Sequence, residues 1–265
     1  MKKNRITFLL VIISCLFVFY ACQAPTNTND DNPPNVENTT NPPEPIEKEE
    51  LPAEVSRAIG IDISHNNGQI EWDKLKSAGI DFVFIKATQG ETFVDPMFSQ
   101  NGAQATNAGL PWGAYHFYQA NDDPITQANF FLSTLVDAEG ASLPVVLDIE
   151  QASVTGNFAV DQLSADLLSF LKTVESGIGL KPIIYTDVNF GNEYLTNPEF
   201  ADYPLWIADY AADSDNPSLP ETWKDKGWLF WQNASDHQVP GVQGNSDHNF
   251  FNGDIEALMA LIQAN

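Results

Sequence analysis

The run PVVLDIE, residues 144–150, places two carboxylates at the end of an apolar segment. On a β-strand, Asp148 and Glu150 are two positions apart, so both side chains point to one face, with Cβ atoms about 6 to 7 Å apart, and the intervening apolar residues point to the other. Carboxyl groups this close raise each other's pKa, so one can keep its proton while the other is ionised. Glycoside hydrolysis requires that division of labour.

The pair could instead be strand-terminal polar residues that cap the next segment or bind Ca²⁺. A third carboxylate favours chemistry. Asp62 also stands between apolar neighbours, Ile61 and Ile63, near the end of an earlier strand-like run. An unpaired buried charge is costly, so three inward carboxylates indicate a site that uses them.

The sequence predicts neither a metal nor a cofactor. It contains no calcium loop of the Asp-x-Asp-x-Asp-Gly kind, and its four histidines, at positions 65, 116, 237 and 248, lack a metal spacing such as His-x-x-x-His. Gly-x-Ser-x-Gly and Gly-rich phosphate loops are also missing, which argues against Ser-His-Asp hydrolysis and phosphate binding. We interpret His116 as a hydrogen-bonded structural histidine.

Strand-like and helical patterns alternate along the chain in the order of βα units. The predicted strands cover residues 58–64, 81–88, 111–117, 144–150, 181–187, 204–210, 228–234 and 246–251. The predicted helices cover about 70–79, 97–108, 124–136, 160–175 and 254–263. The pattern predicts a single α/β domain, an irregular TIM-like (β/α)5(β)3 barrel of parallel type that is trimmed in its second half.

In such a barrel the carboxyl ends of the strands form the active face. Acidic and aromatic residues fall there, and the candidates for substrate binding are Tyr115, Tyr185, Asp187, Asp209 and Trp231. The aromatic ones, together with Tyr210, either stack on sugar faces or belong to the core. Trp206 and Trp228 are interpreted as core residues. Asp247, on the last strand, joins the acidic set.

The N-terminal sequence predicts an export signal followed by a tether. Residues 1–22 have a basic start, an apolar stretch from Ile6 to Tyr20 and the sequence FYAC, which resembles a lipoprotein signal-peptidase site ending at Cys22. The apolar stretch is short for a membrane span. Residues 23–53 are rich in Pro, Asn, Thr and Glu and predict a disordered tether. We therefore expect an exported lipoprotein, anchored to a membrane through Cys22 and exposed on the periplasmic side or the cell surface.

Residues 54–265 hold eight basic residues against 29 acidic ones. Such a surface disfavours nucleic acid as a partner and tolerates neutral or cationic glycans. Cys15 and Cys22 are the only cysteines, so this part of the chain has no disulfide; a core of this size needs none. We expect a monomer.

Eight segments resemble, in order, the glycoside hydrolase family 25 lysozymes, also called Chalaropsis-type muramidases. They are GIDISHNNGQIEW, DFVFIKATQGETFVDPMF, GAYHFY, LPVVLDIE, PIIYTD, PLWIADY, FWQ and DHNFFNG. The resemblance covers essentially all of residues 57–262. The resemblance implies a barrel of five βα units followed by mainly β structure. It also implies cleavage of the β-1,4 bond between N-acetylmuramic acid and N-acetylglucosamine in peptidoglycan glycan strands, without a cofactor.

Carried over residue by residue, the family's Asp-x-Glu pair falls on Asp148 and Glu150, its N-terminal acidic residue on Asp62 and its late active-site Asp on Asp247. The resemblance implies that Glu150 protonates the leaving oxygen and then acts as base. Asp148 would orient or charge-stabilise the N-acetyl group or the developing oxocarbenium ion, and Asp62 and Asp247 would tune and position the rest. One departure is His248 after Asp247, where an apolar residue is expected.

Two other classes compete with this interpretation. A chitinase-type or glucosaminidase barrel would also end strand four with acidic residues, but the chitinase type carries an Asp-x-x-Asp-x-Asp-x-Glu run, and here SLPVVL precedes Asp148. A glycan-binding lipoprotein without turnover would keep the barrel. Loss of an acidic residue would be its signature, and all four are present.

Overall fold

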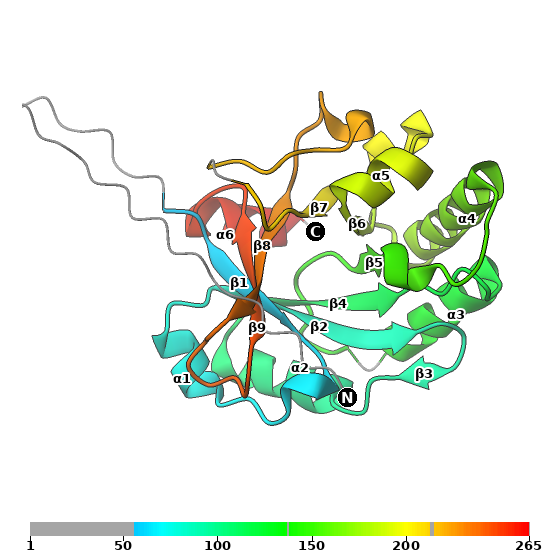
Figure 1. Cartoon of the computed structure of the whole chain (residues 1–265). Coiled ribbons are helices and arrows are strands. Elements are labelled where there is room, and N and C mark those ends of the chain that lie inside the picture. The colour runs from blue at the N-terminus through cyan, green and yellow to red at the C-terminus, as the bar shows by residue number, and fades with distance from the viewer. Residues whose placement is uncertain (1–55, 137, 213–214, 265) are drawn as a thin grey trace, which may run out of the picture. The chain divides into compact units, whose positions relative to one another are not determined.

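Eight strands form a closed barrel, because the first and the last strand in the order of the sheet also pair with each other. The computed structural model describes residues 56–136, 138–212 and 215–264. The order around the sheet is β1-β9-β8-β7-β6-β5-β4-β2, the pairing of β1 with β2 completes the barrel, and β3 adds to the outer edge of β2 (Figure 1). The strands are β1 (Ile59–Ile63), β2 (Phe82–Gln89), β3 (Phe93–Val94), β4 (Trp112–Phe117), β5 (Val146–Asp148), β6 (Ile183–Asp187), β7 (Leu205–Ala208), β8 (Phe230–His237) and β9 (Ser246–Phe251).

Helices connect the parallel strands and cover the outside of the barrel. They are α1 (Trp72–Ser77), α2 (Phe98–Ala108), α3 (Pro124–Leu135), α4 (Val160–Ile178), α5 (Val188–Tyr194) and the final α6 (Ile255–Ala264), with short 3₁₀ turns at His65–Asn67, Gln151–Ser153, Pro198–Asp202 and Glu221–Trp223. Five βα units therefore precede a mainly β second half. The predicted (β/α)5(β)3 barrel is confirmed.

The expectation of a wholly parallel barrel is wrong for the last strand. β9 runs antiparallel to both β8 and β1. The connection from β8 to β9, residues 238–245, is too short for a parallel crossover, which needs about a dozen residues or more. Because β9 runs in the opposite direction, its first residues, and not its last, lie at the rim formed by the carboxyl ends of the other strands. Strand β3, a two-residue hairpin partner of β2, is also absent from the prediction.

Two apolar layers follow from the alternation of side chains along the strands. The layer inside the barrel contains large aromatic residues, and the ring of Phe84 lies 4.5 Å from that of Trp206 and 5.1 Å from that of Phe230, centroid to centroid. Glycine makes room for this packing: a Cβ at Gly60 would stand 2.3 Å from the ring of Phe82. These inward aromatic residues, Phe82, Phe84, Trp206 and Phe230, fill the barrel below its mouth, and we call them the aromatic plug. The second layer lies between the strands and the helices.

Leu258 of α6 is fully buried against the inner layer. Within the part of the chain that the structure describes, no helix has the length and apolar character needed to cross a membrane. Residues 1–55, which contain the predicted signal peptide, Cys22 and the tether, lie outside the described residues.

The aromatic plug predicts a large loss of stability when it is truncated. Phe84 is completely buried, so Phe84→Ala should lower the free energy of unfolding by about 3 to 5 kcal/mol, since it removes a large side chain and leaves a cavity. Urea unfolding measures this value. The matched control is Val136→Ala, at a side chain that is 82% exposed, which should change stability by no more than about 0.5 kcal/mol. A similar small effect at Phe84 would show that the plug does not support the barrel.

Candidate active site

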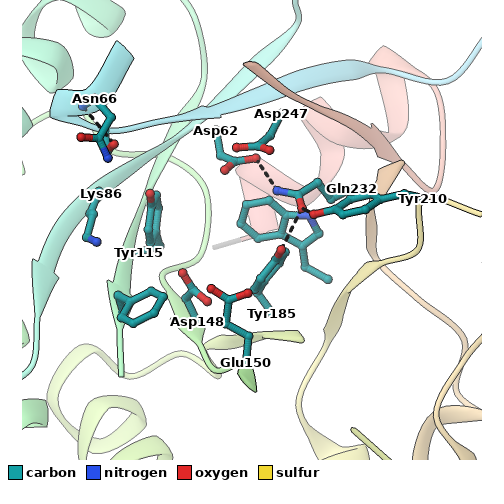
Figure 2. A pocket seen from close by; sticks show the side chains of 13 residues that line it. Asp62, Asn66, Lys86, Tyr115, Asp148, Glu150, Tyr185, Tyr210, Gln232 and Asp247 are labelled. Atoms are coloured by element: carbon teal, nitrogen blue, oxygen red, sulfur yellow. Dashed lines mark hydrogen bonds between the residues drawn. The ribbon is translucent and has the colours of Figure 1, made fainter. Parts of the chain in front are cut away.

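A cavity of about 320 Å³ opens at the mouth of the barrel, above the aromatic plug (Figure 2). The side chains around it come from the carboxyl ends of the parallel strands, from the segments that follow them and from the start of β9. They are Asp62, Ser64, Asn66, Lys86, Tyr115, Phe117, Asp148, Glu150, Tyr185, Trp206, Tyr210, Gln232 and Asp247. The four carboxylates predicted as catalytic are all among them.

Asp148 and Glu150 reach this cavity although β5 is shorter than predicted. The strand ends at Asp148, and Glu150 precedes a 3₁₀ turn. The backbone of Glu150 stays extended, with φ −147° and ψ 179°, and its N–H donates to the hydroxyl of Ser153 at 3.2 Å. The alternation of the strand therefore continues beyond its last hydrogen bond, and both carboxylates lie at the cavity, as Figure 2 shows.

Asp62 is held by two side-chain amides. Its Oδ2 accepts a hydrogen bond from Nε2 of Gln232 at 2.9 Å and one from Nδ2 of Asn249 at 2.8 Å. The amide of Asn249 is oriented by Trp206, whose Nε1 donates to Oδ1 of Asn249 at 2.8 Å. Oε1 of Gln232 accepts from the hydroxyl of Tyr185 at 2.8 Å. Each amide oxygen is thus used by a neighbour, which leaves the amide N–H groups directed at Asp62.

The carboxyl groups of Asp62 and Asp247 interact directly. Burial, the negative charge of Asp62 and a hydrogen bond between the two carboxyl groups raise the pKa of Asp247 to about 9. Burial also raises the pKa of Asp62, but the hydrogen bonds from Asn249, Gln232 and Asp247 act in the opposite direction. On balance the pKa of Asp62 is raised as well, but the two amide hydrogen bonds favour its ionised form, so we expect the proton of the pair to reside on Asp247.

Asp148 and Glu150 are both shifted toward the protonated state. Burial, followed by the charge of Glu150, raises the pKa of Asp148 well above its ordinary value, and Lys86 opposes that shift. Burial, followed by the charge of Asp187, raises the pKa of Glu150, again against Lys86. Oδ1 of Asp148 is buried without a hydrogen-bond partner among the described residues. Both shifts favour the protonated form of the pair, and Oδ1 of Asp148 remains an unpartnered acceptor atom.

Asp187 and Asp209 lie beside this cavity and not in it. With Glu150, Tyr185 and Tyr210 they line an adjoining cavity of about 680 Å³. Oδ1 of Asp187 accepts from the backbone N–H groups of Asn189 and Phe190 at 2.8 and 3.0 Å and so begins α5. The carboxylate of Asp209 accepts from the backbone N–H groups of Ala211 and Ser218 at 3.2 and 2.8 Å. Both residues shape the loops at the rim.

Trp231 does not reach either cavity, which corrects the expectation that it contacts substrate. It is 5% exposed and belongs to the layer outside the barrel, where its ring packs on Trp228 and Phe250. Its Nε1 donates to the backbone oxygen of Asp209 at 2.9 Å. On β8 the inward positions are Phe230 and Gln232, so Trp231 necessarily faces outward.

His116 is a structural residue, as predicted. It is completely buried, with Nδ1 2.7 Å from Oγ1 of Thr88 and Nε2 3.2 Å from Oε1 of Gln127. Burial lowers its pKa to about 3. Tyr115 and Tyr185, predicted as substrate-binding residues, both line the cavity, and burial raises the pKa of each hydroxyl well above its ordinary value.

Several residues at the site are absent from the sequence prediction, namely Lys86, Gln232 and Asn249, and Trp206 was assigned to the core alone. The sequence does contain a signal for Lys86, Gln232 and Asn249: each lies two residues from an inward-facing aromatic residue on the same strand, so its side chain faces the same way. Lys86 follows Phe82 and Phe84 at intervals of two, Gln232 follows Phe230, and Asn249 precedes Phe251. Among the described residues no group of three or more His, Cys, Asp or Glu is arranged to hold a metal ion.

Comparisons with known proteins agree with this geometry. The family profile described as Glycosyl hydrolases family 25 matches residues 61–242. Lysozyme M1 of Streptomyces globisporus is 35% identical over 225 residues, which are 82% of this chain and 75% of that protein. An uncharacterized protein of Escherichia coli K12, YegX, is 38% identical over 209 residues, 77% of this chain and 72% of its own. The crystal structure of the bacterial lysozyme from Streptomyces coelicolor superposes with a TM-score of 0.71 at 32% identity, over 79% of this chain and 98% of that one.

The raised carboxyl pKa values predict a stability that falls as pH rises. Folded Asp247 keeps its proton to about pH 9, whereas the unfolded chain releases it near the ordinary value of 3.8. Between these values the native state binds more protons, so the free energy of unfolding should decrease from about pH 4 to about pH 9.

Urea unfolding at several pH values measures this slope, and Asp247→Asn should flatten it. Asp225→Asn, at an exposed position, is the matched control and should leave the slope unchanged. An Asp247→Asn slope equal to that of the wild type would show that the proton is not held there.

Proposed function

The chain belongs to glycosyl hydrolases family 25, and on that premise we propose that it is a muramidase. It hydrolyses the β-1,4 bond between N-acetylmuramic acid and N-acetylglucosamine in peptidoglycan. The observation that carries this function is the convergence of four carboxyl groups with raised pKa on one cavity at the barrel mouth. Lysozyme M1 of Streptomyces globisporus is 35% identical to this sequence over 225 residues.

Glu150 supplies the proton in the proposed reaction. The bond between C1 of N-acetylmuramic acid and O4 of N-acetylglucosamine breaks while the carboxyl of Glu150 protonates O4, and N-acetylglucosamine leaves as a free alcohol. Water then adds to C1 and its proton passes to Glu150, which restores the acid and leaves a new reducing end on N-acetylmuramic acid. A general acid needs a pKa raised toward the working pH, and burial together with neighbouring charges raises that of Glu150.

Asp148 positions the reacting sugar. Its Oδ1 has no hydrogen-bond partner among the described residues, and it lies at the cavity close to Glu150 in Figure 2. The acetamido N–H at C2 of N-acetylmuramic acid is a donor that would satisfy this oxygen. Held there, the acetamido group lies beside C1, where its carbonyl oxygen can stabilise the positive charge that develops as the bond breaks.

Asp62 provides a fixed negative charge opposite that pair. The amide hydrogen bonds from Gln232 and Asn249 favour its ionised form and fix its position, so an ionised Asp62 would stabilise an oxocarbenium-like transition state without reorganising. Asp247 holds the neighbouring proton and limits the repulsion between the two carboxyl groups. Tyr115, Tyr185 and Tyr210 form walls for the sugar rings, and Asp187 and Asp209 fix the rim loops.

Mass spectrometry of digested peptidoglycan tests the activity and the role of Glu150 together. Wild-type protein should generate new reducing ends on N-acetylmuramic acid, labelled by borohydride reduction. Glu150→Gln should lower the rate by about 10²-fold or more, because it removes the transferable proton. The exposed Glu139→Gln is the matched control and should retain the wild-type rate.

Other outcomes reject the proposal in distinct ways. New reducing ends on N-acetylglucosamine would assign the protein to the glucosaminidases. Cleavage of chitin in preference to peptidoglycan would favour the chitinase type. If neither the wild type nor Glu150→Gln cleaves peptidoglycan from several kinds of bacterial cell wall, the non-catalytic glycan-binding lipoprotein is favoured.

We further propose that the enzyme is exported and tethered. Residues 1–22 act as a lipoprotein signal peptide, Cys22 carries the lipid, and residues 23–53 link it to the barrel of residues 54–265. The support is the basic start, the apolar stretch and the FYAC sequence, followed by polar residues. A lipid anchor would hold a monomeric enzyme at a membrane face next to the peptidoglycan it cleaves.

Fatty-acid labelling and membrane fractionation in a bacterial host test the anchor. Wild-type protein should incorporate the label and sediment with membranes, and Cys22→Ala should do neither. Cys15→Ala is the matched control, since position 15 lies within the apolar stretch, and it should behave as the wild type. Labelling that persists in Cys22→Ala would reject this site of lipidation.

A further inference from the structure

One basic side chain stands among the carboxylates. Of the thirteen described residues that line the catalytic cavity, Lys86 alone carries a positive charge. In Figure 2 it lies beyond Tyr115, at the side of the cavity away from Tyr210. The roles assigned to the four carboxylates leave Lys86 without a function, although placing an ammonium group in a partly buried position is unfavourable.

The ammonium group of Lys86 is held in place without an ion pair. Nζ donates to Oε1 of Gln89 at 2.8 Å and lies 4.8 Å from the ring centroid of Phe117 and 5.9 Å from that of Phe93. None of the ion pairs found between described residues involves it. An ammonium has three N–H donors, so two remain for a ligand.

A strand irregularity creates this arrangement. Residues three apart on a regular strand face opposite sides, but the pairing of β2 with β4 shifts register between Lys86 and Thr88. The bulge turns Gln89 to the same side as Lys86, where the two side chains meet. Bulges beside active sites commonly re-aim a side chain in this way, which indicates that the position of Lys86 is built into the fold.

The ligand atom for Lys86 follows from its neighbour. Lys86 and Asp148 line the same cavity, and the unpartnered oxygen of Asp148 is an acceptor suited to the acetamido N–H at C2. The next ring carbon, C3, carries the lactyl ether in N-acetylmuramic acid and a hydroxyl in N-acetylglucosamine. Because C3 adjoins C2, a lactyl group on C3 can reach a donor on the wall that Asp148 shares, and Lys86 is a donor only that lines the same cavity.

We propose that Lys86 recognises the lactyl group of the N-acetylmuramic acid whose C1 is attacked, and so distinguishes this sugar from N-acetylglucosamine. The inference rests on the proposed function, because it takes N-acetylmuramic acid as the sugar on the Asp148 side. Where the stem peptide is present, Lys86 donates to the lactyl carbonyl. Where it has been removed, the free lactyl carboxylate forms an ion pair with the ammonium.

Calorimetric binding to the Glu150→Gln protein, in which turnover should be slower by about 10²-fold or more, tests this assignment. The two ligands are a peptide-free peptidoglycan tetrasaccharide of alternating N-acetylglucosamine and N-acetylmuramic acid, and chitotetraose, which lacks lactyl groups. With Lys86 present the peptidoglycan fragment should bind at least about ten-fold more tightly, as expected for a hydrogen bond to a charged group. Adding Lys86→Met should abolish the preference, and adding Lys86→Arg should retain it.

The remaining outcomes overturn the proposal. A preference that survives Lys86→Met assigns the lactyl group to another residue, and an equal loss of affinity for both ligands gives Lys86 a structural role only. Absence of any preference in the parent protein, or of binding to either ligand, also contradicts it. Urea unfolding of each variant identifies misfolded protein, in which case Lys86→Gln replaces Lys86→Met.

The muramidase activity is judged separately. Wild-type protein is incubated with the same peptidoglycan tetrasaccharide and the products are analysed by mass spectrometry. Failure to cleave would reject the proposed function even if the binding preference were present. Cleavage without a Lys86-dependent preference would reject only the specificity assigned to Lys86.

Discussion

A single ionised carboxylate, held by two amides in a closed barrel, is the interaction on which the rest of the site depends. Asp62 is 9% exposed and takes hydrogen bonds from Gln232 and Asn249, and these amides are oriented in turn by aromatic donors. The aromatic plug beneath excludes water, which strengthens every charge interaction at the mouth. Burial is the main cause of the raised pKa of Asp247, Asp148 and Glu150, and the charge of Asp62 adds to the shift of each.

The same carboxyl groups lower the stability of the fold and give the site its chemistry. Buried carboxyl groups of one sign repel each other, and the fold tolerates them because protons and amides neutralise part of the charge. The groups that lower the stability of the barrel at high pH are thus those that can donate a proton and stabilise positive charge. Lys86 balances this acidic set from the far side of the cavity, without closing an ion pair that a substrate would have to break.

Much of this could be predicted from the sequence because strands and helices have different periods. The alternation around Asp148 and Asp62 predicted inward carboxylates, and the ordered segments predicted the barrel. The direction of β9 was missed because the alternation of side chains along a strand is the same for parallel and antiparallel pairing, and only the short connection before β9 indicates its antiparallel course. Trp206 was correctly assigned to the core, and the structure adds that it also lines the cavity. Trp231 was assigned to the wrong face, since an aromatic residue near a strand end fits either face until its register with Phe230 is counted. Gln232 and Asn249 are single amides, whose function appears only when three distant strands meet.

The most direct test of the account is the protonation state of the Asp62 and Asp247 pair. Carbon-13 NMR of the protein labelled at the aspartate carboxyl carbons, with assignment through Asp62→Asn and Asp247→Asn, reports each group as a function of pH. We predict that at pH 7 the Asp247 carbon has the chemical shift of a protonated carboxyl and the Asp62 carbon that of a carboxylate. Two ionised groups at pH 7, or a protonated Asp62 beside an ionised Asp247, would contradict the central role given to the amide-bound charge.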